Sequence, residues 1–342
     1  MPEPIDHVME LIFGRWRSQI LYTGVELGVF EVLKGTDEPQ PAGAVAEERA
    51  LDRQGTYRLM RALASLGLLA EDGKHCFSLT EAGELLLENN PISLRGIARL
   101  ENGPTHYEVW KYLGDLVREG VPPNGFQREF GHGVFTHLEQ DPAYTQRFNE
   151  AMTSLSRLES EQVKGLLGDK AFEDVEHVCD VGGGHGHLLC TLLEDAPGTR
   201  GTVLELSEVA NAEEGHQHEP MGLTDRVDFV VGDFFEGIPS ADAYLMKHIL
   251  HDWSDDECIQ ILSSVRQAAP EGARLFVCEL VIPRPDRSHL SKLFDVQMML
   301  ATTGRERTVE EYDELFAKSG WERVKTYADD AVLMSTIEAH AV

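Results

Sequence analysis

From Val175 onwards, short apolar runs alternate with longer stretches of helical periodicity, and this alternation constrains the fold more than any other feature of the sequence. Strands that alternate with helices along a chain are typical of a parallel sheet whose crossover helices cover both faces. We therefore expect an α/β fold with a doubly wound, Rossmann-like sheet in this part of the chain. The expected strands are His177–Val181, Gly201–Leu206, Val227–Val231, Ala243–Met246 and Leu275–Glu279.

The N-terminal part of the chain has apolar residues at helical spacing instead. Helices are expected within 5–33, over 42–50 and after Asp52, a residue type that caps helix N-termini. Two apolar runs around a Gly-containing turn indicate a β-hairpin over 68–79, and a further helix is expected from Thr80. This order of helix, helix, hairpin and helix is that of a winged helix.

The region between these two parts is expected to be helical and to connect them. Helical spacing resumes over 91–167 and is interrupted by a loop rich in Gly and Pro at 120–133. We place the domain boundary at residue 100, so that 1–100 form the winged-helix-like domain and 101–342 form the domain with the sheet. Within the second domain, 101–167 supply connecting helices.

Composition limits the partners and the compartment. The 342 residues include 59 acidic and 30 basic ones, and a formal net charge of −29 disfavours binding to nucleic acid. Adaptation to high salt, which screens such self-repulsion, is one open explanation of this charge. The five cysteines are odd in number and scattered without a C-x-x-C pair, which indicates reduced thiols. No apolar run approaches the ~20 residues of a membrane span, so we expect a cytoplasmic protein.

A glycine-rich loop follows the first expected strand. It reads Asp180-Val-Gly182-Gly-Gly184-His-Gly186, and such a loop lets the backbone turn tightly and approach an anionic group at a helix N-terminus. The dinucleotide fingerprint G-x-G-x-x-G fails, because His187 occupies its last position. The pattern of an acid followed by alternating glycines resembles the loop of S-adenosylmethionine (SAM) methyltransferases.

Two acidic residues end the next two expected strands. Glu205 is placed to accept hydrogen bonds from both ribose hydroxyls of a nucleoside. Asp233 is placed to accept from the adenine amino group, while Phe234 beside it covers the face of the ring. Either acid alone would be interpreted as an ordinary surface residue. A glycine loop and two acids at three successive strand ends indicate an adenosine-binding crevice.

The fourth expected strand runs into a segment with two histidines, His248 and His251. Methyl transfer from a sulfonium needs a nucleophile near the methyl carbon, and a phenol with a pKa of ~10 needs a base to ionise it. An imidazole at the edge of the crevice suits that task. By residue type alone, both histidines qualify as the base.

Four motifs together resemble the caffeic acid-type O-methyltransferases of plants and their bacterial relatives, over nearly the whole chain. They are D-V-G-G-G-x-G at 180–186, G-D-x-F at 232–235, M-K-x-x-x-H-D-W-S-D at 246–255 and E-R-T at 306–308. The resemblance implies a homodimer that forms through the N-terminal domain, with SAM as cofactor, S-adenosylhomocysteine as its product and no metal. The sequence departs from the family's usual Gly-Gly at 301–304.

The resemblance also implies the roles of individual residues. It makes His251 the general base, with Glu279 and Glu306 orienting its ring as a carboxylate does in a serine-protease triad. The cofactor positions are Ser156, Asp180, Gly182, Gly184, Glu205, Asp233, Phe234, Lys247 and Trp253. The substrate positions are Phe148, Met152, Asp252 and Met298.

We therefore expect a SAM-dependent O-methyltransferase that acts on a small hydroxylated aromatic compound, without a role for nucleic acid or membrane. One alternative keeps the fold and cofactor but methylates carbon or nitrogen, or uses SAM for other chemistry. A second is a SAM-binding module without catalysis. The third is a winged-helix regulator that binds DNA through Arg53, Arg58 and Arg61, which the net charge disfavours. His216 and His218 are interpreted as part of a polar loop rather than as metal ligands.

Overall fold

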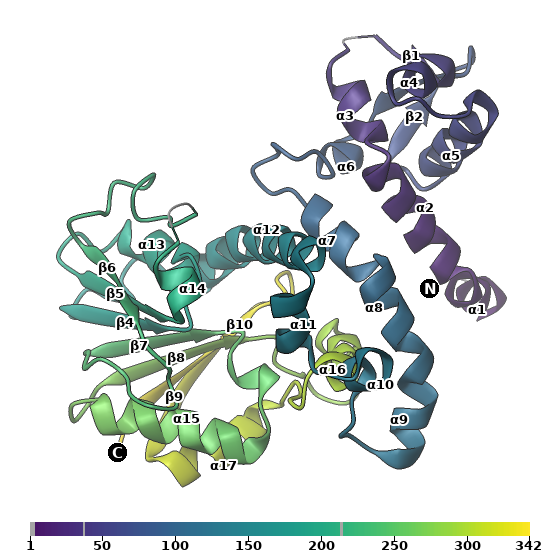
Figure 1. Cartoon of the computed structure of the whole chain (residues 1–342). Helices are drawn as coiled ribbons and strands as arrows, with labels where there is room; N and C mark the ends of the chain where they lie inside the picture. Colours follow the sequence, from purple (N-terminus) through teal and green to yellow (C-terminus); the bar gives the residue numbers. More distant parts are fainter. Residues whose placement is uncertain (1–3, 37, 213–214) are drawn as a thin grey trace. The chain divides into compact units, whose positions relative to one another are not determined.

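The computed structural model describes residues 4–36, 38–212 and 215–342, and these divide into two compact units (Figure 1). Unit 1 comprises the described residues of 1–111 together with 135–155, and unit 2 comprises those of 112–134 and 156–342. The long helix α12, Pro142–Leu167, contributes residues to both units. The domain boundary at residue 100 stays a prediction. Within the described ranges, no helix is both long and apolar enough to cross a membrane.

Unit 2 is built on a seven-stranded sheet with the strand order β6-β5-β4-β7-β8-β10-β9. The strands from β6 to β8 pair in parallel and coincide with those expected from the sequence, which confirms the doubly wound α/β class. At one edge β10 pairs antiparallel with β8 and β9, and these last two strands are additional to the expectation. The strands are β4 (His177–Val181), β5 (Arg200–Glu205), β6 (Val227–Val231), β7 (Ala243–Lys247), β8 (Arg274–Glu279), β9 (Trp321–Ala328) and β10 (Ser335–Ala341).

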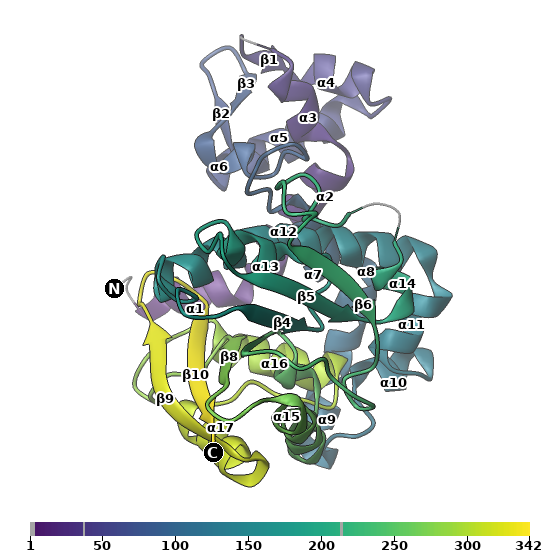
Figure 2. The same cartoon turned by 90° about the vertical axis from the view of Figure 1, so that its left-hand side faces the viewer.

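Helices cover both faces of this sheet, because successive residues of a buried strand point to opposite sides. Met246 and Val277 pack with helices α15 and α17 on one face. Their neighbours Leu245 and Cys278 pack on the other face with α13 and the C-terminal part of α12. Figure 2 shows α15 and α17 on one side of the sheet and α13 on the opposite side. The continuous apolar runs of the sequence are therefore strands buried on both faces.

The helices of unit 2 include one that the sequence did not lead us to expect. Helix α10 lies within 120–133, where a loop is expected, because Asn124 and Gln127 form a reciprocal capping box that starts it. The hydrogen bonds of this capping box thus start a helix although the segment is rich in Gly and Pro. The helices are α9 (Leu113–Glu119), α10 (Gly125–Phe130), α13 (His187–Leu193), α14 (Ser207–Ala210), η2 (Leu250–Asp252), α15 (Asp255–Ala268), α16 (Ser291–Ala301) and α17 (Val309–Ser319).

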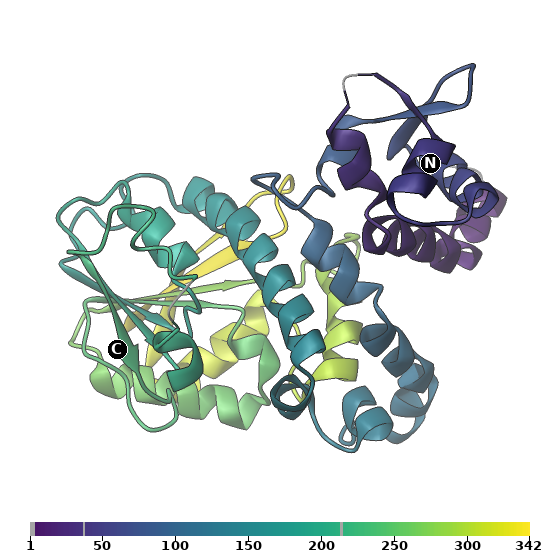
Figure 3. The ribbon, with the colours of Figure 1, turned by 45° about the horizontal axis from the view of Figure 1, so that its top comes forward.

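Unit 1 contains the helix, helix, hairpin and helix order of a winged helix, drawn in purple and blue in Figure 3. Its small sheet has the strand order β1-β3-β2. Asp52 caps α5 as expected, since its side chain accepts a hydrogen bond from the Gly55 amide. Phe30, Met60 and Phe77 form its core. Its elements are α1 (Pro4–Ile12), α2 (Gly14–Glu26), α3 (Val29–Lys34), β1 (Gln40–Pro41), α4 (Ala42–Glu48), α5 (Arg53–Ser65), β2 (Leu69–Glu71), β3 (Cys76–Leu79), α6 (Glu81–Glu84), α7 (Arg95–Glu101) and α8 (Pro104–Val109). The elements η1 (Trp110–Tyr112) and α11 (Val134–Gln140) lie where the chain passes between the units.

Candidate active site

The carboxyl ends of the parallel strands bring the expected site residues of unit 2 to one edge of the sheet. Strand β4 ends in the glycine loop, β5 ends at Glu205, and β6 leads directly into Asp233. Strand β7 ends at Lys247 and β8 at Glu279. Residues that lie up to 99 positions apart in the chain (from 180 to 279) therefore share one edge of the sheet.

The glycine loop is fixed by close backbone contacts. Gly182 has a φ of +67°, which favours glycine, and a Cβ there would lie 2.6 Å from Cδ1 of the Ile249 side chain. The Gly182 amide donates to the Leu204 carbonyl at 2.9 Å, and the Gly184 amide approaches Oε2 of Glu205 at 3.4 Å. Burial raises the pKa of Glu205, which indicates a carboxylate largely removed from water. The loop and the acid thus face each other across the strand ends.

Asp180 is a buried carboxylate without ordinary hydrogen-bond partners among the described residues. It is 1% exposed, and neither of its oxygens accepts a hydrogen bond of good geometry there. Burial raises the pKa of Asp180 to about 7, although the positive charge of Lys247 opposes the rise. A buried carboxylate of this kind is costly unless a donor or a cation satisfies it. The position therefore fits a ligand that carries an ammonium group or N–H donors.

Aromatic rings lie beside Asp233, at the end of β6. The side chain of Asp233 accepts a hydrogen bond from the Phe235 amide at 2.8 Å, which fixes the carboxylate at the end of β6. The ring of Phe234 meets that of Trp253 edge to face, with centroids 6.0 Å apart. Asp233, Phe234 and Trp253 therefore lie together, as a pocket for a flat heterocycle requires.

Lys247 is held by two residues of helix α12. Its Nζ donates to Oε2 of Glu159 at 3.1 Å and to Oγ of Ser156 at 3.3 Å. Glu159 is not among the expected site residues, and the signal for it is its place one helical turn after Ser156. Burial would raise the pKa of Glu159, but the charges of His248 and Lys247 lower it to about 2. The carboxylate is therefore ionised.

His251 lies in the short helix η2 after β7 and is buried against two carboxylates. Its Nδ1 lies 2.9 Å from Oε1 of Glu306 and 3.6 Å from Oε2 of Glu279, while its Nε2 lies 3.8 Å from Oδ1 of Asp252. Burial alone would lower the pKa of His251, but Glu279, Asp252 and the hydrogen bond with Glu306 raise it to about 10. Nδ1 therefore has a hydrogen-bond partner, whereas Nε2 has no hydrogen bond of ordinary length to any described residue.

Glu279 fixes the backbone that carries the histidine. Its Oε1 accepts hydrogen bonds from the amides of Ile249 and Leu250 at 3.2 and 3.0 Å. Although burial opposes ionisation, the charges of His251 and His248 hold the pKa of Glu279 below its usual range. By contrast, burial raises the pKa of Glu306 against the effect of its bond to His251. The two acids therefore differ: one is held ionised, and the other is the direct partner of the imidazole.

Arg307 and Gly304 hold the E-R-T segment, 306–308, against residues 250–253. These residues follow β7 and include His251, and we call them the histidine turn. The fully buried guanidinium of Arg307 donates to the carbonyls of Leu250 at 2.8 Å and Trp253 at 2.9 Å. A Cβ at Gly304 would lie 2.0 Å from the carbonyl oxygen of His251. Segment 301–304 departs from the family's Gly-Gly, yet it keeps glycine at the position that the close approach requires. Arg307 belongs to a recognised motif, but its own role was not expected.

The structure does not test all of the expected substrate positions. Phe148 and Met152 belong to the part of α12 in unit 1. There the ring of Phe148 packs on that of Tyr144, with centroids 6.2 Å apart. Met298 is buried on α16, and Phe294 on the same helix stacks on His251 with centroids 6.1 Å apart. The substrate roles of Phe148, Met152, Met298 and Asp252 stay predictions, and Phe294 is a neighbour of the base that was not expected.

Two groups of histidines among the described residues lie close to other side chains. Of their His, Cys, Asp and Glu side chains, only His248, His251 and Glu279 approach closely enough to form a metal-sized group. That metal is not needed stays a prediction. His216 lies in a loop, as expected, and its ring stacks on Phe229 with centroids 3.7 Å apart.

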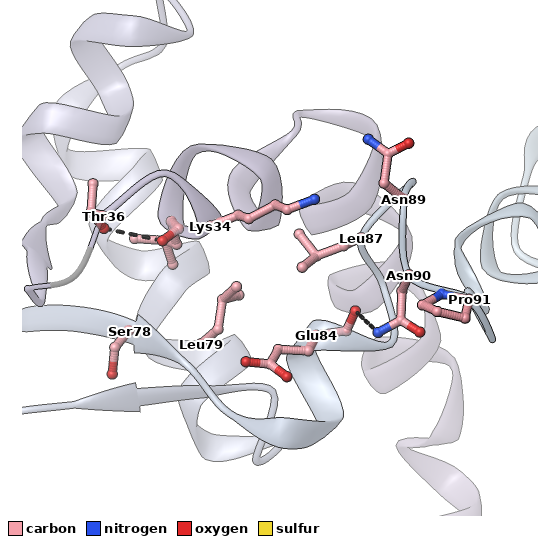
Figure 4. Close-up of a pocket in the computed structure, with 10 residues that line it drawn as sticks. Lys34, Thr36, Ser78, Leu79, Glu84, Leu87, Asn89, Asn90 and Pro91 are labelled. Carbon is pink, nitrogen blue, oxygen red and sulfur yellow. Dashed lines mark hydrogen bonds between the residues drawn. The ribbon is translucent and has the colours of Figure 1, made fainter.

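A separate pocket of about 430 Å³ lies in unit 1 (Figure 4). Among the described residues that line it, Lys34 and Glu84 carry charges, and Thr36, Ser78, Asn89 and Asn90 add neutral polar groups. Figure 4 shows Asn90 bonded to the backbone at Glu84, so part of this polar surface is already satisfied. It contains none of the expected catalytic or cofactor residues, and the strand ends of unit 2 remain the candidate site.

Comparisons with known proteins agree on both parts of the chain. An O-methyltransferase dimerisation domain matches residues 9–89, and an O-methyltransferase domain matches residues 110–322. The phenazine O-methyltransferase PhzM of Lysobacter antibioticus is 32% identical over 98% of this chain and 96% of its own length. The structure of the mitomycin 7-O-methyltransferase MmcR is 33% identical, with a TM-score of 0.86, over 98% of this chain and 97% of that one. Human N-acetylserotonin methyltransferase, solved with SAM, is 26% identical with a TM-score of 0.88, over 100% of this chain and 98% of that one.

Proposed function

Because the chain belongs to the SAM-dependent O-methyltransferases, we propose that it methylates a hydroxyl of a small aromatic natural product with His251 as the general base. The observation that carries the proposal is the asymmetry of the His251 ring. Nδ1 is hydrogen-bonded to Glu306 at 2.9 Å, whereas within the part of the chain that the structure describes Nε2 makes no comparable bond. The tautomer with hydrogen on Nδ1 leaves the lone pair of Nε2 available to a substrate hydroxyl.

The raised pKa of His251 favours some hydroxyl acceptors over others. A phenol with a pKa of ~10 matches the pKa of about 10 that the carboxylates give to His251, so proton transfer between them is nearly balanced. An aliphatic hydroxyl is a far weaker acid and would retain its proton. The base therefore favours phenolic acceptors. The relatives whose names mention a phenazine or mitomycin support an aromatic natural product as the acceptor.

The residues at the strand ends suit SAM as the cofactor. When bound, SAM would supply an electrophilic methyl group on a sulfonium, with S-adenosylhomocysteine as the leaving group. The unsatisfied carboxylate of Asp180 suits an ammonium group, and Glu205 suits the ribose hydroxyls. Asp233, Phe234 and Trp253 suit the adenine ring, and we also assign Gly182, Gly184, Ser156 and Lys247 to the cofactor site. No metal is required by this mechanism.

Methylation of carbon or nitrogen is the alternative in the same fold, but the hydrogen bond between His251 and Glu306 favours a hydroxyl that must lose a proton. The family membership also favours an enzyme over a SAM-binding module or a DNA-binding regulator.

We further propose that the enzyme is a homodimer. The dimerisation domain supports this, as does an apolar face on the first two helices of unit 1. Ile5 is 74% exposed, Leu11 68% and Trp16 57%, and such a patch is costly in water unless a partner covers it. Sedimentation at micromolar concentration checks the proposal, and a monomer would contradict it.

The experiment that tests the reaction is methyl transfer from isotope-labelled SAM to a panel of phenols, catechols and aromatic amines. We expect labelled O-methyl products, with turnover in His251→Ala reduced by about two to four orders of magnitude, the usual contribution of a general base. SAM binding by calorimetry should stay near the wild-type value in this variant. His340→Ala, at the far end of β10, is the matched control and should retain activity. Full activity of His251→Ala, or products methylated only on nitrogen or carbon, would contradict the proposal.

A further inference from the structure

The second histidine of the motif, His248, lies in an unusual backbone conformation between two buried acids. Its φ is +54°, a region that residues other than glycine adopt rarely and at a cost in free energy. Its Nε2 lies 2.9 Å from Oε1 of Glu159, and its Nδ1 lies 3.6 Å from Oε2 of Glu279. The fold therefore maintains a strained residue in order to place this imidazole between Glu159 and Glu279.

The two nitrogens of His248 determine which protonation state fits the position. An ionised carboxylate only accepts hydrogen bonds, and a neutral imidazole has one N–H and one lone pair. Either neutral tautomer would direct a lone pair at Glu159 or at Glu279. The imidazolium alone presents an N–H to both acids. His251 differs, because its one hydrogen bond to an acid among the described residues is that of Nδ1 with Glu306 at 2.9 Å, while its Nε2 lies 3.8 Å from Oδ1 of Asp252. A neutral ring with hydrogen on Nδ1 satisfies Glu306 and leaves the lone pair of Nε2 for a substrate hydroxyl.

His248 and His251 also share one carboxylate oxygen. Oε2 of Glu279 lies 3.6 Å from Nδ1 of each ring, and among the described residues it has no hydrogen-bond partner of ordinary length. The two rings stack with centroids 4.8 Å apart and planes inclined by 29°. A positive charge on one ring therefore acts on the other through a short, buried path, and both rings compete for the same oxygen.

We propose that His248 is held as an imidazolium between Glu159 and Glu279 and that, as a positioning residue, it lowers the pH at which Nε2 of His251 becomes free to accept a proton. This inference rests on the proposed role of His251 as the base. The charge of His248 offsets part of the negative charge around His251 and occupies Glu279, which would otherwise stabilise only the imidazolium of His251. Without His248, the acids would hold the proton on His251 more firmly.

All the charged groups around the two rings enter this balance. Burial would lower the pKa of His248, but the charge and hydrogen bond of Glu159 and the contact with Glu279 raise it, as the proposal requires. Lys247 opposes that rise, and Glu159 remains ionised beside both cations. The groups that face the rings are Glu159 on α12, Lys247 on β7, Asp252 on η2, Glu279 on β8, and Glu306 followed by the buried Arg307.

The test removes the positive charge of His248 with a residue that can keep the positive φ of this position. Asparagine tolerates positive φ better than other non-glycine residues, so His248→Asn removes the imidazolium with little added strain. The pKa of His251, followed by ¹⁵N NMR of histidine-labelled protein, should rise by about one pH unit in this variant. On the acidic side of the pH profile, kcat should fall about tenfold and should approach the wild-type value at alkaline pH. His248→Lys restores a positive charge and should return the pKa of His251 toward that of the wild type.

The wild-type protein provides a measurement that does not depend on the folding of any variant. In its ¹⁵N spectrum, both ring nitrogens of His248 should be protonated at pH 8. A neutral His248 at that pH would overturn the proposal, and so would an unchanged or lowered pKa of His251 in a folded His248→Asn protein. A loss of kcat in His248→Asn that is equal at every pH, up to an alkaline plateau, would assign His248 a structural role only and would also overturn it.

Failure of the proposed function gives a different result. If His251 is not the base, His251→Ala retains turnover while the NMR titrations of His248 and His251 can still behave as described. If only the inference about His248 is wrong, His251→Ala is inactive and the titration of His251 does not respond to substitution of His248.

Discussion

Nδ1 of His251 lies 2.9 Å from Oε1 of Glu306, although the two residues are 55 positions apart in the chain. The carboxylate fixes which ring nitrogen carries hydrogen, and it stabilises the imidazolium that forms when Nε2 accepts a proton. Catalysis by this ring should therefore depend on the carboxylate as well as on the imidazole.

Glu306→Gln should lower the maximal kcat by about ten- to a hundredfold, because the amide cannot stabilise the charged ring. Loss of the negative charge should also lower the pKa of His251, so the acidic limb of the pH profile should move to lower pH. The measurement is kcat against pH with a phenolic acceptor. Glu310→Gln, on the first turn of α17, is the matched control and should leave the profile unchanged. An unshifted limb in Glu306→Gln would count against its contact with the base.

The wild-type rate should rise with pH across the neutral and mildly alkaline range. The pKa of His251 is raised to about 10, so most of the imidazole is protonated at pH 7 and cannot accept a proton. Each unit of pH below that pKa should increase the neutral fraction, and with it kcat, by up to about tenfold. The measurement is turnover in overlapping buffers at saturating substrate. A rate that is constant between pH 6 and 8 would show that deprotonation of His251 does not limit the reaction.

Gly304→Ala should disrupt the site locally. The added Cβ would lie 2.0 Å from the carbonyl oxygen of His251, and backbone cannot yield as a side chain does. We expect a loss of about 1–3 kcal/mol in the free energy of unfolding, as in other overpacked sites, together with loss of turnover. Gly133→Ala is the control, since a Cβ there meets nothing within 4 Å. Equal thermal unfolding curves for the two variants would contradict the close approach at 304.

Arg307→Met should destabilise the protein more than Arg305→Met does. Arg307 is fully buried and donates to three carbonyls and to Asp255, whereas the side chain of Arg305 is 41% exposed. Removing a buried charged donor from its partners costs about 3–5 kcal/mol, whereas an exposed pair contributes about 0–1 kcal/mol. Urea unfolding of both variants measures the difference. Similar midpoints would show that Arg307 does not hold the histidine turn in place.

Asp233→Ala should weaken SAM binding about ten- to a hundredfold, the cost of losing a hydrogen bond to a charged acceptor. Isothermal titration calorimetry measures this affinity. Asp228→Ala changes an exposed acid on β6, the strand that leads into Asp233, and its affinity should match the wild type. Wild-type affinity in Asp233→Ala would remove this residue from the cofactor site.

Local patterns in the sequence determined most of the elements that carry the site. Continuous apolar runs specify strands buried on both faces, and these runs coincide with β4 to β8. Asp52 and the hairpin at 68–79 could be recognised because caps and tight turns depend on a few neighbouring residues. The motifs at 180–186 and 246–255 identified the family for the same reason, since their chemistry lies in contiguous residues.

Only the tertiary structure decided how His251, Glu279 and Glu306 meet and that Glu159 joins His248 from a helix nearly ninety positions earlier. Helix α10 and the antiparallel strands β9 and β10 also lay beyond the local patterns. Helix α10 starts from a capping box within a segment rich in Gly and Pro, and β10 is specified by its pairing with β8. Distances between residues far apart in the chain are set by the packing of whole elements, and no short sequence window contains that information.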